Sequence, residues 1–153
     1  MLVGHSYGGA IITGAGNDDH VKSLVYVAAF QPDTGESLAS LGGGKPPAGA
    51  PLKPSADGFL YIDPAAFHAD FAADLPAGEA SFMARSQVGL SVKAATAVAT
   101  SPAWKTKPSF AVVATQDRSI NPELERFMYK RSHATVIELP SSHAVYMLSL
   151  IHI

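Results

Sequence analysis

The sequence contains no cysteine, which excludes disulfide bonds and thiolate metal ligands and fits a reducing compartment. Charged residues make up only 16% of the chain, and the net charge is -2. No long basic run is present to bind nucleic acid or an anionic membrane. No apolar run approaches the roughly 18 residues of a membrane-spanning helix. We therefore expect a cytoplasmic protein with a small-molecule partner, while a signal sequence upstream of Met1 stays open.

Hydrophobic residues account for 47% of 153 residues, enough for one domain with a buried core. Short apolar runs alternate with helical stretches along the chain. Such continuous runs are typical of parallel strands covered on both faces, so we predict an α/β fold with right-handed crossovers. The predicted strands are 1–4, 23–30, 108–114 and 134–139, and helices are predicted at 6–16 and from 121 to about 132.

The middle of the chain, residues 31–107, is predicted to be a largely helical excursion from this core. Residues 31–58 are rich in Gly and Pro and favour an irregular loop. Asp63 followed by Pro64 is a typical helix start, and two or three helices are expected from there to about residue 100. This divides the chain into core segments 1–30 and 108–147, a lid at 31–107, and a short tail at 148–153.

Ser6 lies within Gly4-His5-Ser6-Tyr7-Gly8, a G-x-S-x-G pattern between a predicted strand and a predicted helix. On such a sharp turn, side chains two residues to either side of the serine would collide, which accounts for Gly4 and Gly8. The following helix directs its positive end at developing negative charge. Ser6 is therefore the candidate nucleophile, and the backbone N–H of Tyr7 is a candidate oxyanion donor. The alternative is an ordinary helix-capping serine.

A serine nucleophile needs a base that an acid orients, and the elbow pattern predicts the chain order Ser, acid, His. Asp117 directly follows the strand 108–114, and His143 follows the strand 134–139. Asp33, which follows the strand 23–30, is the strongest rival for the acid, and a local turn role for Asp117 is the other alternative. The remaining acidic candidates are interpreted as helix caps or solvated faces: Asp57, Asp63, Asp70 and Asp74.

Two glycine-rich segments do not match a nucleotide-binding motif. Gly42-Gly43-Gly44-Lys45 is followed by Pro46 where a phosphate loop needs Ser or Thr, and no strand precedes it. Gly14-Ala15-Gly16 lacks the third glycine of a dinucleotide fingerprint. No zinc-binding cluster is present either. We expect neither a cofactor nor a metal.

These segments together resemble the α/β-hydrolase superfamily, in particular the bacterial esterase-like branch related to plant methylesterases and hydroxynitrile lyases. The resemblance rests on residues 2–10, 24–30, 114–118 and 142–144 and extends to about Met147. It implies a carboxylic-ester hydrolase that works through an acyl-enzyme, with Ser6 as nucleophile, Asp117 as acid and His143 as base. It also implies that the lid covers an apolar substrate site, with these candidate contacts: His5, Phe59, Tyr61, Phe67, Phe71, Phe82, Met83 and Trp104. Packing within the lid is the alternative role for the lid aromatics and Met83.

The family sheet has eight strands, and the four predicted here resemble its strands five to eight. We therefore expect a C-terminal fragment that lacks the loop supplying the second oxyanion N–H, with little or no activity as given. The uncovered strand edge at residues 1–4 is expected to favour self-association. Residues 148–153 do not resemble the family's continuing helix and are interpreted as an artefactual tail.

Two other functions remain open at this stage. A lyase acting on cyanohydrins would use the same triad together with a lid lysine. The lid offers four candidates for that residue: Lys45, Lys53, Lys93 and Lys105. A non-catalytic ligand-binding protein, or an inert fragment, is the remaining alternative.

Overall fold

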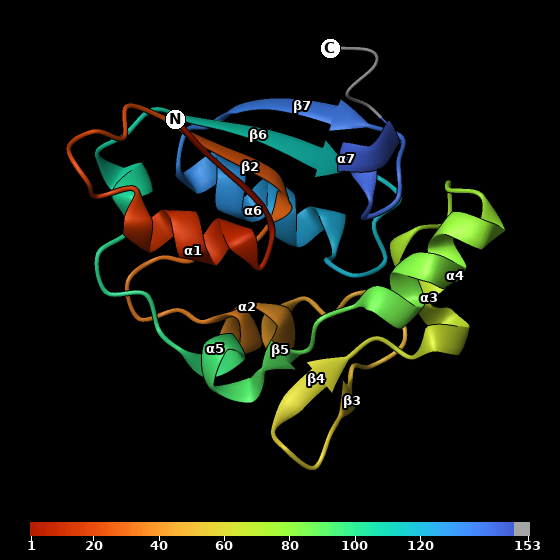
Figure 1. Cartoon of the computed structure of the whole chain (residues 1–153). Coiled ribbons are helices and arrows are strands. Elements are labelled where there is room, and N and C mark those ends of the chain that lie inside the picture. Colours follow the sequence, from red (N-terminus) through yellow and green to blue (C-terminus); the bar gives the residue numbers. More distant parts are fainter. Residues whose placement is uncertain (149–153) are drawn as a thin grey trace.

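The computed structural model describes residues 1–148 and has a four-stranded parallel sheet as its centre (Figure 1). The strand order is β1-β2-β6-β7, and the register pairs Leu24 of β2 with Leu2 on one side and Ser109 on the other. This confirms the predicted α/β fold with a parallel sheet. The strands are β1 (Leu2–Ser6), β2 (Leu24–Ala29), β6 (Ser109–Ala114) and β7 (Thr135–Leu139).

Helices α1 (Gly8–Ala15) and α6 (Pro122–Arg131) pack with the short helix η1 (Ala103–Lys105) against one face of the sheet. Helix α6 begins where the sequence predicts, because Asn121 accepts a hydrogen bond from the N–H of Glu123 and Pro122 needs no partner at the first position. None of the helices within residues 1–148 combines the length and apolar character needed to cross a bilayer. The shared core contains residues from all these elements, among them Ile12, Tyr26, Trp104, Val113, Met128 and Tyr129.

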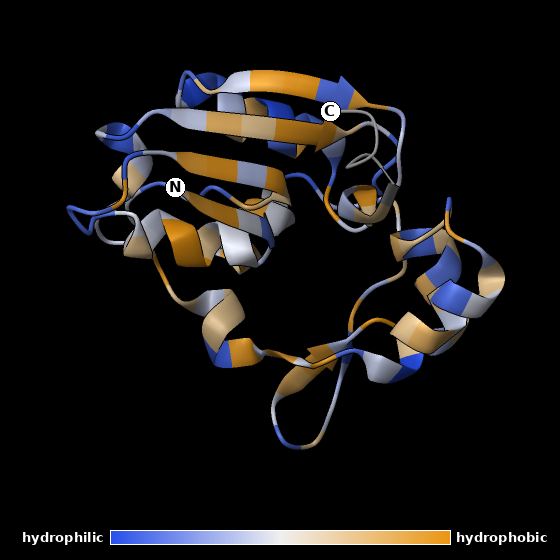
Figure 2. Ribbon diagram, turned by 45° about the horizontal axis from the view of Figure 1, so that its top comes forward, coloured by the Kyte–Doolittle hydropathy of each residue, from blue (hydrophilic) through white to orange (hydrophobic). Residues whose placement is uncertain are grey.

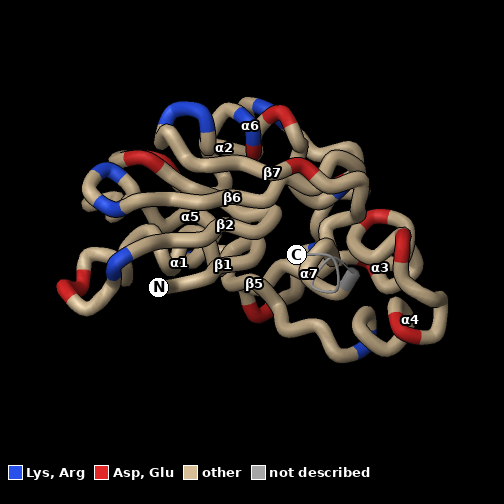
Figure 3. The backbone as a smooth tube through the Cα atoms, turned by 90° about the horizontal axis from the view of Figure 1, so that it is seen from above, with Lys and Arg blue, Asp and Glu red and all other residues tan. Residues whose placement is uncertain are grey.

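The opposite face of the sheet is less covered than the sequence predicts. Only α7 (Val145–Leu148) packs there among the described helices, and it lies at one end over Ala28 and Val112 (Figure 3). The strands are rich in apolar residues (Figure 2). On this face Val3 is 59% exposed and Ile137 is 45% exposed. The expectation that the strands are covered on both faces is therefore wrong for this face.

The excursion (residues 31–107) forms a second layer, with α3 and α4 past the carboxyl ends of the core strands (Figure 1). Asp63 caps α3 as predicted. Residues 31–58 are more ordered than expected, because Ser37 and Ser40 form a reciprocal capping box that starts α2. A small antiparallel sheet of order β3-β4-β5 was not predicted, since strands this short leave no alternating pattern. The elements are α2 (Leu38–Gly44), β3 (Lys53–Pro54), β4 (Phe59–Tyr61), α3 (Pro64–Phe71), α4 (Ala77–Ser86), β5 (Leu90–Ser91) and α5 (Val92–Thr96).

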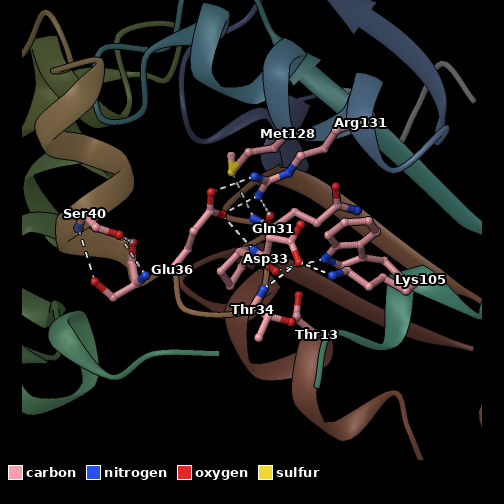
Figure 4. Close-up of polar contacts among 12 residues, drawn as sticks. Thr13, Gln31, Asp33, Thr34, Glu36, Ser40, Lys105, Met128 and Arg131 are labelled. Atoms are coloured by element: carbon pink, nitrogen blue, oxygen red, sulfur yellow. Dashed lines mark hydrogen bonds and ion pairs between the residues drawn. The ribbon is translucent and has the colours of Figure 1, made fainter. Parts of the chain in front are cut away.

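The two ends of the excursion meet at a neck formed by Gly35, Glu36 and Ala99. The N–H of Gly35 donates to the carbonyl of Ala99, and the N–H of Ala99 donates back to the carbonyl of Glu36, both at 2.8 Å. The Glu36 carboxylate accepts two hydrogen bonds from the guanidinium of Arg131 in α6, at 2.6 and 2.7 Å (Figure 4). The neck is thus closed on itself and attached to the core by a bidentate ion pair.

Tyr129 of α6 supports the end of β2, and its loss is expected to destabilise the core. Its buried hydroxyl donates to the carbonyl of Ala29 and accepts from the N–H of Ala29, both at 2.8 Å. Tyr129→Phe leaves both groups buried without a partner, so the free energy of unfolding should fall by about 1–3 kcal/mol in urea denaturation. Tyr61→Phe is the control, because the Tyr61 hydroxyl has no hydrogen bond within the described residues. Equal effects of the two changes would contradict this role.

Candidate active site

Ser6 is the last residue of β1 and adopts a left-handed backbone with φ of 54°. A Cβ on Gly4 would lie 2.5 Å from the carbonyl oxygen of Gly8, and one on Gly9 would lie 2.2 Å from that of Phe30. The strand and helix therefore approach so closely that Gly4 and Gly9 admit no side chain. The expected collision at Gly8 is wrong, because a Cβ placed there meets no described atom within 4 Å apart from its chain neighbours and the backbone of its own helix.

Tyr7 begins α1 directly after Ser6. Its carbonyl accepts from the N–H of Ala10 at 2.9 Å, whereas its own N–H has no hydrogen-bond partner within the described residues. Tyr7 and Ser6 line the same cavity. An unpaired N–H at the positive end of a helix beside a serine hydroxyl is suited to receive an oxyanion.

Asp117 and His143 form a buried pair at the ends of β6 and β7. The Nδ1 of His143 lies 2.5 Å from Oδ2 of Asp117, and both side chains are buried. The other carboxylate oxygen, Oδ1, accepts from the N–H groups of Ser119 at 2.7 Å and Ile120 at 2.9 Å. Since the carboxylate accepts, Nδ1 of His143 donates, and this leaves Nε2 as the acceptor. His143 lines the same cavity as Ser6.

The cavity beside Ser6 and His143 has a volume of about 1000 Å³ and lies between the core and the excursion. Four of the expected substrate contacts are among its lining residues: His5, Phe59, Phe67 and Phe71. Phe67 of α3 is buried. Further apolar side chains complete the wall, among them Phe30, Leu38, Leu60, Ile62, Leu90 and Ile120.

Four expected substrate contacts are not among the residues that line this cavity: Tyr61, Phe82, Met83 and Trp104. Trp104, a residue of η1, is buried in the core and donates its indole N–H to the carbonyl of Pro32 at 2.9 Å. On α4, Met83 packs against the core between α3 and α4, whereas Phe82 is 65% exposed. The sequence shows that these side chains are apolar but not which way each helix faces.

His5 supports His143 in addition to lining the cavity. Its Nε2 lies 2.9 Å from the backbone carbonyl of His143, and the two rings are 4.6 Å apart between centroids. Burial, followed by the charge of His143, lowers the pKa of His5 to about 4. At neutral pH His5 is therefore neutral and donates from Nε2, because a carbonyl only accepts.

The rival acid Asp33 forms an ion pair with Lys105 at 2.5 Å at the base of the excursion, and neither residue lines the cavity (Figure 4). Asp33 therefore does not contact His143. Of the four candidate lysines for a lyase, none lines the cavity within the described residues: Lys45, Lys53, Lys93 and Lys105.

Glu125 of α6 is a buried acid that the sequence analysis missed. Its side chain is fully buried, and neither carboxyl oxygen has a hydrogen-bond partner within the described residues. Burial, followed by the charge of Asp117, raises the pKa of Glu125 to about 10, so the carboxyl is neutral at physiological pH. The helical spacing of Glu125 with Met128 and Tyr129, both in the core, is the signal that identifies it.

The parallel sheet, the strained serine elbow and the acid–histidine pair together are the features that define the α/β-hydrolase fold. A family model described as the α/β hydrolase family matches residues 1–149, and the chain belongs to that family.

Individual relatives are similar to this chain over different lengths. A carbendazim-hydrolysing esterase from Nocardioides sp. (strain SG-4G) is 51% identical over 43 residues, which are 27% of this chain and 18% of that protein. The structure of a pyrethroid hydrolase superposes with a TM-score of 0.77 at 21% identity, covering 97% of this chain and 64% of its own. An extracellular α/β-hydrolase from a Paenibacillus species gives a TM-score of 0.74 at 16% identity, covering 97% and 66%. The chain thus spans less than two thirds of the length of each of these proteins.

Glu125 is expected to make stability fall as pH rises. Its raised pKa means that, between the ordinary value of 4.5 and about 10, the folded state holds a proton that the unfolded state lacks. The free energy of unfolding then falls by about 1.4 kcal/mol per pH unit. Glu125→Gln removes this dependence. In urea denaturation, the free energy of unfolding of the variant relative to that of the parent should therefore rise by about 2–3 kcal/mol between about pH 6 and about pH 8. Exposed Glu79→Gln is the control, and parallel pH curves for Glu125→Gln and the parent would contradict the neutral carboxyl.

Proposed function

We propose that the chain belongs to a serine hydrolase that cleaves carboxylic esters through an acyl-enzyme. One observation carries the proposal: His143, whose Nδ1 is bound by Asp117, lines the same cavity as Ser6. The names of the similar esterase and hydrolases support the same class of reaction.

Each group has one role in the proposed reaction. Ser6 Oγ attacks the ester carbonyl carbon while Nε2 of His143 takes its proton, and the N–H of Tyr7 donates to the resulting oxyanion. The C–O bond to the alcohol then breaks, and His143 returns the proton to the leaving alkoxide. Water then attacks the acyl carbon while His143 takes its proton, the bond from that carbon to Ser6 Oγ breaks to release the acid, and His143 returns the proton to Ser6. Asp117 holds the imidazole and stabilises its positive charge throughout.

The cavity supports a largely apolar substrate. Its volume of about 1000 Å³ lies at the upper end of what small-molecule sites offer, and its wall carries the aromatic rings of Phe59, Phe67 and Phe71. We therefore propose a small-molecule ester with a bulky apolar acyl or alcohol group. The absence of cysteine supports a cytoplasmic location. No observation on the described residues favours a lyase or a pure ligand-binding protein.

Ser6→Ala is expected to abolish ester hydrolysis, because the alanine has no oxygen to attack the carbonyl. With p-nitrophenyl butyrate, kcat should fall by about 10⁴-fold or more. An organophosphonate should add one mass equivalent to the parent and none to the variant, by mass spectrometry. Exposed Ser81→Ala on α4 is the control and should behave like the parent. Hydrolysis that survives Ser6→Ala, with the fold verified by circular dichroism, would refute the assignment.

We also propose that β1 pairs with a second copy of the chain through its free edge. β1 is the outer strand of the described sheet, and the N–H of Leu2 bonds to the carbonyl of Ser23 beside β2. Alternate N–H groups point to opposite edges, so that of Val3 points away from the sheet. Val3→Pro removes this donor and should convert a dimer into a monomer in sedimentation velocity, whereas Val3→Thr should not. A parent chain that is monomeric at high concentration would rule this out.

A further inference from the structure

Asp74 follows α3 in the excursion, yet its carboxylate forms hydrogen bonds to the loop that carries His143. Its Oδ2 accepts from the hydroxyl of Ser141 at 2.6 Å and from the N–H of Ser142 at 2.8 Å. Its Oδ1 accepts from the hydroxyl of Ser142. The sequence interpretation of Asp74 as a helix cap or solvated residue is therefore wrong. Its carboxylate binds the two residues that immediately precede His143.

The backbone at the end of α3 binds the same loop from the other side of His143. The carbonyl of Phe71 accepts from the N–H of Ala144 at 2.9 Å and lies 3.2 Å from the hydroxyl of Ser142, whose single proton is shared with Asp74. The ring of Phe71 meets the imidazole of His143 edge-on, with 4.7 Å between centroids. Residues on both sides of His143 are thus held by α3 and the turn after it.

Asp70, the residue before Phe71 in α3, binds the loop that carries Asp117. Its carboxylate accepts from Nε of Arg118 at 2.9 Å, and its carbonyl accepts from the hydroxyl of Ser119 at 2.8 Å. The interpretation of Asp70 as a cap or solvated residue is also wrong. The segment 70–74 therefore holds the residues next to both Asp117 and His143.

The charge on Asp74 suits it to this task. Burial pushes the pKa of Asp74 upward, but the hydrogen bonds from Ser141 and Ser142 outweigh burial and leave the pKa below its ordinary value. Hydrogen bonds to an ionised carboxylate are about twice as strong as those between neutral groups. Asp74 does not line the cavity, so its contribution is to geometry and not to substrate contact.

We propose that Asp74 is a positioning residue that aligns His143 with Ser6 through Ser141 and Ser142. This inference rests on the proposed function, because it concerns the same acid–histidine pair. A displacement of about 1 Å at a catalytic group costs about 10²-fold in rate. Loss of Asp74 therefore lowers kcat and leaves KM nearly unchanged, since the cavity wall itself is intact.

Asp74→Ala tests the proposal through a separation of kcat from KM. With p-nitrophenyl butyrate, kcat should fall about 10- to 100-fold, with KM within about twofold of the parent. Asp74→Asn keeps the shape of the side chain but accepts through one oxygen only, so its kcat should lie between those of the parent and Asp74→Ala. This variant also tests the proposal if the alanine variant does not fold. Asp57→Asn is the matched control, because Asp57 also accepts from a serine hydroxyl, that of Ser55, in the exposed β3–β4 hairpin. Unchanged kcat, or a rise in KM alone, would overturn the proposal.

A second measurement does not depend on turnover. In a Ser6→Ala background, the proton between Nδ1 of His143 and Asp117 is expected to give a low-field proton resonance. Asp74→Ala should shift or broaden it, and Asp57→Asn should leave it in place. An unaltered resonance in Asp74→Ala would overturn the positioning role, whatever the activity of the chain. Hydrolysis that survives Ser6→Ala would instead refute the proposed function alone, so the two failures are distinct.

Discussion

The buried carboxylate of Asp117 is the constraint on which the described site depends. An ionised carboxyl group removed from water is costly unless donors surround it. Asp117 finds them in the N–H groups of Ser119 and Ile120 and in the imidazole of His143. Satisfying this charge requires the turn after β6 and the loop after β7 to meet, and it orients the imidazole as a consequence. The neutral carboxyl of Glu125 fits the same logic, because a second charge beside Asp117 would have no donors.

Several residues hold the two loops from outside. His5, next to Ser6, donates to the backbone of His143, and Phe71 and Asp74 bind the residues around it. Asp70 does the same for the residues after Asp117. The acid and the histidine come from the core, but much of their support comes from the excursion. The cavity wall and the support of the pair thus share one structural element, since Phe71 belongs to both.

The sequence was sufficient for the features that depend on chain order and local pattern. Ser6 lies in a five-residue turn motif, and Asp117 and His143 each follow an apolar strand, so their common edge of the sheet was predictable. The direction in which a single side chain points could not be predicted from the sequence. Trp104 faces the core and Phe82 faces solvent because of how their helices pack. Asp74 contacts Ser142 across 68 positions of sequence, and no local pattern reports such a contact.

The closed neck of the excursion has a consequence for how this architecture varies. Because Gly35, Glu36 and Ala99 bond to one another, the ends of the intervening segment stay together whatever its length, and lengthening such a loop costs little. Segments of different size are therefore interchangeable at this point without disturbing the order of the core strands. Replacing the segment has one requirement, however. If Asp74 has the proposed positioning role, a replacement segment must again present a carboxylate and a backbone carbonyl to the loop after β7. Substrate specificity can then vary only among segments that meet this condition.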